Sequence, residues 1–155
     1  SMRRSEPTTQ TFLLDSNVFI AAVRDPKKQT ETLRLLVKII DDQDVALVGN
    51  SILAEEMLRY AELLKSPTAT MIVGSLFAKT RIVNVSENYR KICKTYLKTP
   101  DKADILHAAT CLQTNSTLIT NDRHFDKIRN EGIIKVWSTT EAIRKLLKPK
   151  TLQEG

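Results

Sequence analysis

The stretch Thr11-Phe-Leu-Leu-Asp15-Ser-Asn17-Val-Phe-Ile20 decides the fold, because a short apolar run ends abruptly in a carboxylate. A second apolar segment begins after Asn17. This pattern predicts a buried strand over residues 11–15 that carries Asp15 at its carboxyl end. Parallel sheets bind ligands at the carboxyl ends of their strands, so Asp15 is a candidate for a functional site. An aspartate here also suits a helix N-cap, and this stretch alone favours both interpretations equally.

The composition is that of one folded domain. The 155 residues are 41% hydrophobic with few Gly and Pro, which excludes a disordered chain. No apolar run reaches the ~18 residues of a membrane span, and nothing resembles a signal peptide, so we expect a cytoplasmic protein without membrane contact. Ser1-Met2 resembles an expression-tag remnant. Residues 3–148 are predicted to form a single domain, and residues 149–155 a flexible tail.

Charge and cysteine content narrow the class further. The net charge of +6 favours a polyanionic partner such as nucleic acid, although Lys and Arg are spread over many predicted helices. Cys93 and Cys111 have no His or Cys at zinc-ligand spacing. This argues against a disulfide scaffold and a structural zinc site, and both thiols are interpreted as core residues.

Strand and helix patterns alternate along the chain. Strands are predicted at residues 11–15, 44–49, 82–85, 116–120 and 133–137. Helices are predicted at about residues 17–23, 26–41, 52–65, 67–79, 87–97, 100–114, 123–131 and 139–147, with Asp25-Pro26 starting the second of them. The strand segments are short, aliphatic and only weakly alternating, as in strands covered on both faces. We therefore expect a single three-layer α/β/α domain with a central parallel sheet of four to five strands.

Asp122 repeats the pattern of Asp15. The strand predicted at residues 116–120 is followed at once by Asn121-Asp122. Helix capping explains one such aspartate easily. Two strands that each end in a carboxylate are harder to explain by capping, because parallel strands end at the same edge of a sheet. The two carboxylates are therefore expected to lie close together.

Further acidic residues come from the predicted helices. Glu55 and Glu56 lie early in the helix at 52–65, at a spacing that no capping box explains, and Glu56 is modestly favoured because apolar residues follow it. Asp104 lies among apolar residues of the helix at 100–114, where an unpaired carboxylate is costly. A metal ion or an arginine would relieve that cost. Asp101, one turn earlier, compensates the helix dipole or belongs to the outer part of a site.

Four motifs in this order resemble those of the PIN domain family: Leu14-Asp15-Ser-Asn17, Leu53-Ala-Glu-Glu-Met57, Asp104-Ile-Leu-His-Ala-Ala109 and Leu118-Ile-Thr-Asn-Asp122-Arg-His-Phe125. The resemblance covers residues 11 to 137. Each motif is weak alone, and their order and spacing carry the signal. The family includes the VapC-type toxins of toxin–antitoxin pairs. The resemblance implies a compact α/β fold, a cleft that binds Mg²⁺ or Mn²⁺, and hydrolysis of phosphodiester bonds, most often in RNA.

The resemblance also assigns residues. It gives metal-binding and catalytic roles to four acidic positions: Asp15, Asp104, Asp122 and Glu56, with Glu55 as the alternative. It places Asn17 and Thr120 beside the site, where they orient a carboxylate or a water. Oxygen ligands are those that Mg²⁺ and Mn²⁺ prefer. His107 and His124 are interpreted as neighbours of the site rather than ligands.

The implied function is a divalent-metal-dependent endoribonuclease, with the toxin of a type II toxin–antitoxin pair as one form of it. Its partners would be an RNA substrate, an antitoxin protein and, as is common in the family, a second copy of the chain. Two alternatives stay open: an RNA-processing or turnover nuclease without an antitoxin, and a catalytically silent domain that binds RNA or protein. One metal ion and two are equally compatible with these residues.

Three other α/β classes fit less well. A haloacid-dehalogenase-type phosphatase needs an aspartate where Asn17 stands. A response-regulator receiver needs a phosphoacceptor aspartate at the end of the third predicted strand, where Val85 stands. A dinucleotide-binding domain needs a Gly-rich turn after the first strand, and Asp15-Ser-Asn17 is not such a turn.

Overall fold

The computed structural model describes residues 9–98 and 101–147. The predictions made for Ser1-Met2, for Thr99-Pro100 and for the tail at residues 149–155 lie outside the described residues. Within the described part, no helix is both long and apolar enough to cross a membrane.

Five parallel strands form one sheet in the order β3-β2-β1-β4-β5. Along the chain they are β1 (Gln10–Leu14), β2 (Val45–Gly49), β3 (Thr80–Ile82), β4 (Thr117–Ile119) and β5 (Lys135–Trp137). Strand β1 lies in the middle, and Phe12, Leu13 and Leu14 are at most 1% exposed. Helices cover both faces of a sheet whose central strand is this apolar. The predicted α/β class and parallel sheet are confirmed.

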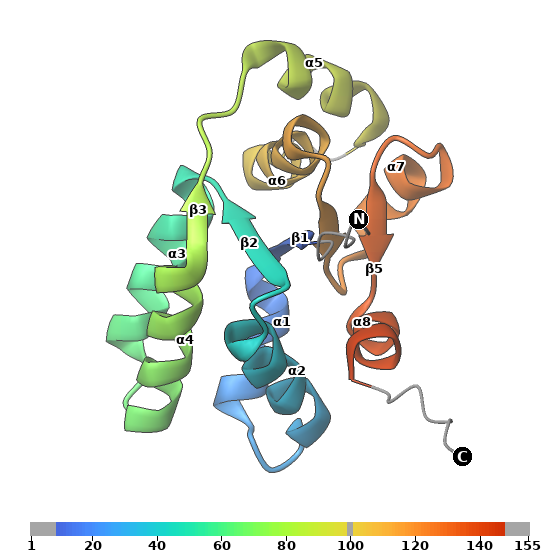
Figure 1. Cartoon of the computed structure of the whole chain (residues 1–155). Coiled ribbons are helices and arrows are strands. Elements are labelled where there is room, and N and C mark those ends of the chain that lie inside the picture. The colour runs from blue at the N-terminus through green and yellow to red at the C-terminus, as the bar shows by residue number, and fades with distance from the viewer. Residues whose placement is uncertain (1–8, 99–100, 148–155) are drawn as a thin grey trace, which may run out of the picture.

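Eight helices and one 3₁₀ turn surround the sheet in the described residues. They are α1 (Ser16–Arg24), α2 (Thr30–Asp41), α3 (Ser51–Leu63), α4 (Pro67–Lys79), α5 (Glu87–Tyr96), α6 (Lys102–Thr114), η1 (Arg123–Phe125), α7 (Asp126–Asn130) and α8 (Thr139–Leu146). In Figure 1, α5, α6 and α7 lie above the sheet, and α1, α2 and α8 lie below it. Helices α3 and α4 form a hairpin beside β3 (Figure 1).

The predicted start of the second helix at Asp25-Pro26 is wrong. Asp25 ends α1, and its carbonyl accepts hydrogen bonds from the backbone N–H groups of Lys28 and Gln29 at 3.1 and 3.0 Å. The chain therefore makes a turn there, and α2 begins at Thr30. The residues have the right chemistry for a helix start, but the carbonyl of Asp25 serves a turn instead.

Two other boundaries differ from the predictions. Strand β3 spans Thr80–Ile82 rather than residues 82–85, because its three residues pair with Leu47–Gly49 of β2. Val85 is apolar and buried, but it lies beyond the strand. The helix predicted at residues 123–131 is divided at Phe125 into η1 and α7.

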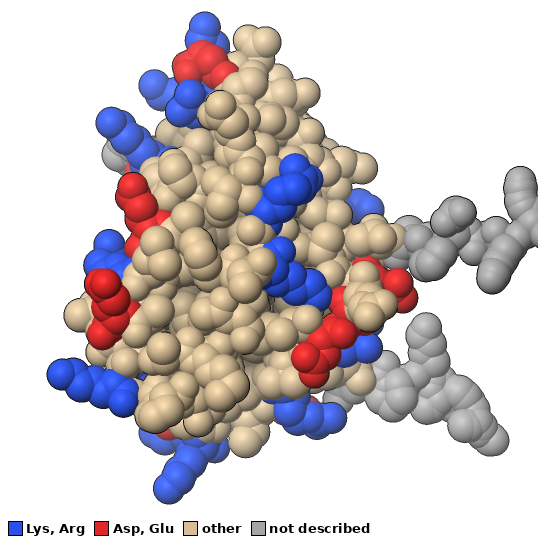
Figure 2. Space-filling view, turned by 60° about the vertical axis from the view of Figure 1, so that its left-hand side comes forward, with Lys and Arg blue, Asp and Glu red and all other residues tan. Residues whose placement is uncertain are grey.

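The charges are unevenly spread over the surface. Figure 2 shows a broad, mostly uncharged face over α3 and α4, with Lys and Arg side chains gathered at its upper end over α5. On the α3–α4 hairpin, Leu58, Leu63 and Met71 are 52%, 60% and 67% exposed.

Candidate metal and active site

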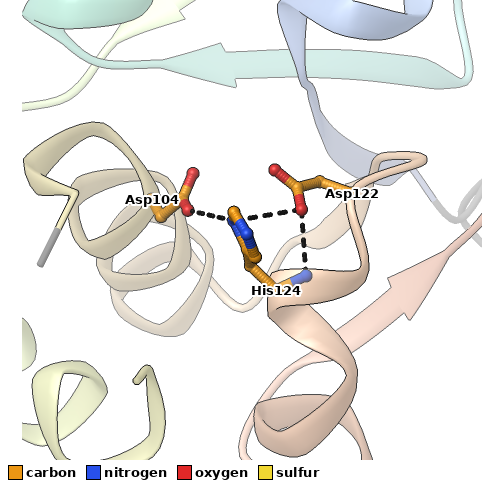
Figure 3. A group of neighbouring side chains, drawn as sticks. All are labelled: Asp104, Asp122 and His124. Carbon is orange, nitrogen blue, oxygen red and sulfur yellow. Dashed lines mark hydrogen bonds and ion pairs between the residues drawn. The ribbon is translucent and has the colours of Figure 1, made fainter. Parts of the chain in front are cut away.

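Helix α6 and the turn after β4 bring Asp104, Asp122 and His124 together (Figure 3). His124 Nδ1 lies 3.1 Å from Asp104 Oδ2 and 3.1 Å from Asp122 Oδ1. One potential ligand atom from each residue lies within 4.8 Å of the others. Asp104 is only 6% exposed, so a buried carboxylate faces a second carboxylate across one imidazole.

Burial raises the pKa of Asp104, and the nearby charges of Asp101 and Asp122 raise it further, whereas the hydrogen bond to His124 lowers it. The hydrogen bond with Asp104 and the charge of Asp122 raise the pKa of His124. The two pKa shifts have different main causes: burial disfavours the charged form of Asp104, whereas the neighbouring carboxylates favour the protonated form of His124. A protonated imidazole compensates part of this charge, and a divalent cation would compensate more of it.

Asp122 also begins the 3₁₀ turn η1. Its Oδ1 accepts a hydrogen bond from the backbone N–H of His124 at 2.9 Å. The carboxylate thus caps the turn and faces His124 at the same time. Helix capping was one of two interpretations of Asp15 from the sequence, but the structure gives a side-chain cap to Asp122.

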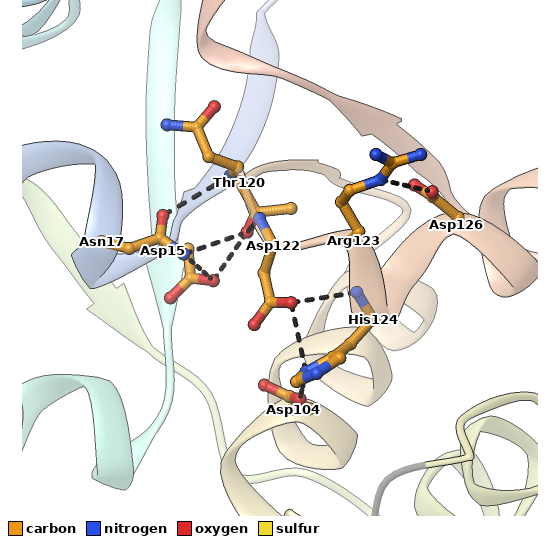
Figure 4. Close-up of polar contacts among 9 residues, drawn as sticks. Asp15, Asn17, Asp104, Thr120, Asp122, Arg123, His124 and Asp126 are labelled. Atoms are coloured by element: carbon orange, nitrogen blue, oxygen red, sulfur yellow. Dashed lines mark hydrogen bonds and ion pairs between the residues drawn. The ribbon is translucent and has the colours of Figure 1, made fainter.

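Asp15 lies at the carboxyl end of β1, 7% exposed, and its side chain makes no cap bond to α1. Its Oδ2 accepts a hydrogen bond from the Thr120 hydroxyl at 2.8 Å (Figure 4). Asn17 Nδ2 lies 3.4 Å from the same oxygen. The interpretation of Asp15 as a side-chain cap is therefore wrong, and the carboxylate is directed toward the end of β4.

Thr120 connects the two strand ends. Its hydroxyl donates to Asp15 and accepts from the backbone N–H of Asp122 at 3.0 Å. Asn17 adds weaker contacts of 3.5 Å to the Thr120 hydroxyl and to the backbone N–H of Asn121. As expected from the parallel topology, the ends of β1 and β4 meet, and a hydroxyl joins their acidic residues.

The two glutamates of α3 differ sharply. Glu55 is exposed, whereas Oε1 of Glu56 is buried and has no hydrogen-bond partner among the described residues. A buried carboxylate oxygen without a partner is costly unless a cation satisfies it. Helix α3 packs against α1 and α6, which carry or adjoin the other acidic residues. No hydrogen bond joins Glu56 to Asp15, Asp104 or Asp122 in the described part of the chain.

A buried polar bridge holds α3 against α6. Asn50 Oδ1 accepts from the backbone N–H of Leu53 at 3.0 Å and caps α3. Its Nδ2 faces His107 Nδ1 at 3.1 Å and donates to the Thr110 hydroxyl at 3.0 Å. Because Oδ1 is bound to a backbone N–H, the amide must donate to His107, which therefore carries its proton on Nε2. His107 is thus a buried packing residue that contacts Asn50, and no sequence pattern indicated the role of Asn50 as the bridge.

Asp101 lies at the start of α6 and caps it, because its Oδ1 accepts from the backbone N–H of Ala103 at 2.9 Å. This corrects the predicted helix start at residue 100 to Lys102. Asp101 acts on Asp104 through its charge, which raises the pKa of that carboxyl.

The residues fit a divalent cation. Asp15, Asp104, Asp122 and Glu56 offer carboxylate oxygens, which Mg²⁺ and Mn²⁺ prefer. Two features favour a cation here: Oε1 of Glu56 is buried without a hydrogen-bond partner among the described residues, and burial raises the pKa of Asp104. Among the described residues, His124 is the one cationic group paired with any of these carboxylates.

Comparison with known proteins adds a family match and structural neighbours. A family model described as the PIN domain matches residues 12–131, which is more than half of the chain. Comparison with curated proteins finds no match.

Three solved structures illustrate the likeness in fold. The chain is similar to VapBC2 from Rickettsia felis, whose crystal structure contains a DNA fragment from the VapBC2 promoter. The sequence identity is 18% and the TM-score is 0.61, and the match covers 83% of this chain and 98% of that chain. It is similar to FitAcB from Neisseria gonorrhoeae at 21% identity and a TM-score of 0.58, covering 83% and 98%. It is similar to PAE2754 from Pyrobaculum aerophilum at 12% identity and a TM-score of 0.55, covering 90% and 98%.

Proposed function

Because the chain belongs to the PIN domain family, we propose that it is a divalent-metal-dependent endoribonuclease that hydrolyses phosphodiester bonds in RNA. One observation supports this most directly. A buried carboxylate with a raised pKa, Asp104, faces Asp122 at the edge of the sheet where parallel α/β folds bind ligands. Family membership supports nuclease chemistry in general, and the choice of RNA and of Mg²⁺ or Mn²⁺ is our proposal.

In this proposal four carboxylates hold the metal: Asp15, Asp104, Asp122 and Glu56. When bound, such an ion makes a water more acidic and stabilises the negative charge of a phosphate under attack. Thr120 keeps the Asp15 carboxylate in place through its hydroxyl. His124 Nδ1 holds a proton between Asp104 and Asp122 when the metal is absent, and so limits their repulsion.

A cleavage assay tests the proposal. Single-stranded RNA should be cut in the presence of Mg²⁺ or Mn²⁺, and EDTA or Asp104→Asn should abolish cutting. Asp41→Asn serves as the matched control, because Asp41 is an exposed carboxylate at the end of α2. Asp104→Asn activity equal to that of the unmodified protein, or full activity in EDTA, would exclude the proposed site.

The toxin of a type II toxin–antitoxin pair is the more specific form of this proposal. Two of the structural neighbours described above are VapBC2 and FitAcB. The exposed apolar residues Leu58, Leu63 and Met71 of the α3–α4 hairpin support a protein partner, either an antitoxin or a second copy of the chain. Charged substitution of Leu63 should weaken that association without changing RNA cleavage.

Growth measurements separate this form from the alternatives. Expression of a toxin should arrest growth, and co-expression of the product of a small adjacent gene should restore it. Unaffected growth with metal-dependent cleavage would favour a processing or turnover nuclease. RNA or protein binding without any cleavage would favour a catalytically silent domain.

A further inference from the structure

A hollow separate from the acidic centre lies between α5, α6 and the first turn of α3. It encloses about 570 Å³. Its rim is formed by Arg90, Lys91 and Lys94 of α5 and Lys102 of α6. We call this hollow the basic groove.

The cations of the basic groove follow from the sequence of α5. Glu87, Arg90, Lys91 and Lys94 stand at positions i, i+3, i+4 and i+7, so they lie on one face of the helix. Arg90 pairs with Glu87 at 3.4 Å, but Lys91 and Lys94 form no ion pair with any described residue. Figure 2 shows Lys and Arg side chains at the end of the molecule where α5 lies. Unpaired cations this close repel one another, and a polyanion would relieve that repulsion.

The interior of the basic groove is apolar. Ile52 of α3 and Ile105 and Leu106 of α6 line it together with the four cations and the carboxylate Glu87. An apolar surface edged by cations suits single-stranded nucleic acid, whose bases lie on the apolar part while its phosphates contact the rim. An acidic protein segment is the alternative occupant, and the binding experiment below distinguishes the two.

The basic groove approaches the acidic centre along α3. Ile52 lines the groove, and Glu56 is one turn further along α3 on the same face. On α6, Asp104 is about 200° around the helix from Lys102, so its carboxylate lies on the face away from the groove. A strand that occupies the groove is therefore led toward Glu56 along α3.

We propose that the basic groove binds single-stranded RNA on one side of the phosphate that is cut. The inference rests on the proposed ribonuclease function and adds the residues that hold its substrate. Lys91 and Lys94 bind phosphates, and the apolar floor contacts a base or a sugar.

Fluorescence anisotropy with a labelled single-stranded RNA tests the groove. The measurement is made in EDTA, so that binding is scored without cleavage. Lys91→Glu/Lys94→Glu should weaken binding by about tenfold or more, and should lower the slope of log affinity against log salt by about 1.4. The matched control is Arg34→Glu/Lys65→Glu, which makes the same charge change at exposed positions on α2 and after α3, away from α5 (Figure 1). The control should retain the affinity within about twofold and the salt slope of the unmodified protein.

The outcomes distinguish the groove from the metal site. Asp104→Asn should bind the RNA at least as well as the unmodified protein while failing to cut it. If the unmodified protein cuts nothing but its RNA affinity depends on Lys91 and Lys94, the proposed activity is wrong and the groove stands. Equal affinity and salt slope in Lys91→Glu/Lys94→Glu would overturn the groove. The groove would also be overturned, in favour of an acidic protein segment, if Lys91→Glu/Lys94→Glu bound RNA as before but no longer bound a poly-glutamate probe.

Discussion

Replacing Thr120 by valine tests the connection between the two strand ends. The substitution conserves shape but removes a hydroxyl that is 3% exposed and makes two hydrogen bonds, to the Asp15 carboxylate at 2.8 Å and from the Asp122 N–H at 3.0 Å. A lost bond to a charged group contributes about 1.5–3 kcal/mol, and a lost neutral bond about 1 kcal/mol. We therefore expect Thr120→Val to lower the free energy of unfolding by about 2–4 kcal/mol in EDTA.

Urea unfolding followed by circular dichroism measures this change. In thermal unfolding the same loss corresponds to about 4–16 °C for a domain of this size. Thr139→Val is the matched control, because the Thr139 hydroxyl is buried without a hydrogen-bond partner among the described residues. The control should be neutral or stabilising. A Thr120→Val protein within about 0.5 kcal/mol of the unmodified one would refute the reasoning, since surface substitutions without a role change stability by no more than that.

Three further predictions concern metal, pH and thiol chemistry. Mn²⁺ should raise the melting temperature of Glu55→Gln but not of Glu56→Gln, because of these two residues only Glu56 has a buried oxygen without a partner among the described residues. If Mn²⁺ raises the melting temperature of both variants equally, Glu56 does not belong to the site. In EDTA, the raised pKa of His124 should stabilise the fold fully below pH 6.5, and this stability should be lost as pH rises through the folded-state pKa. Urea titrations between pH 5.5 and 9 should show the free energy of unfolding falling as pH rises. This dependence on pH should be smaller in His124→Gln, and an unchanged dependence in the variant would contradict the assignment to His124. Burial raises the pKa of Cys93 to about 11 and that of Cys111 still further, so both thiols should resist a thiol reagent at pH 8 until urea unfolds the chain; rapid labelling of the folded protein would contradict their burial.

Much of the candidate site is predictable from local patterns. Asp15 and Asp122 each follow an apolar strand, and parallel strands end at one edge, so the pattern predicts both at the same edge of the sheet. Asp104 stands out because an apolar helix face has no ordinary use for a carboxylate. These inferences need only the order and type of the residues.

Other features depend on packing that no local pattern contains. Glu55 and Glu56 are neighbours on α3, about 100° apart around the helix, and only the contacts of α3 with α1 and α6 bury one of them. His124 comes between Asp104 and Asp122 only when α6 docks beside η1. Their roles are therefore visible only once the helices are in place.

Two errors in the predicted element boundaries also arise from contacts that the local pattern does not show. Asp25-Pro26 is a favourable helix start in isolation, but the chain uses the Asp25 carbonyl for a turn. Val85 suggests a strand because it is apolar, yet it reaches the core from beyond the last residue of β3. The first case is a local turn that competes with the helix start, and in the second the packing of Val85 in the core outweighs its local preference for a strand.

The central position of β1 between β2 and β4 also bears on how the protein is made. Asp15 and its hydrogen-bond partner Thr120 are 105 residues apart in the chain. At a synthesis rate of about 5–20 residues/s, the ribosome adds the intervening residues over about 5–20 s. During that interval a nascent chain carries Asp15 without β4, without Thr120 and without Asp122. The acidic centre is therefore incomplete on the nascent chain until translation of the domain is nearly finished.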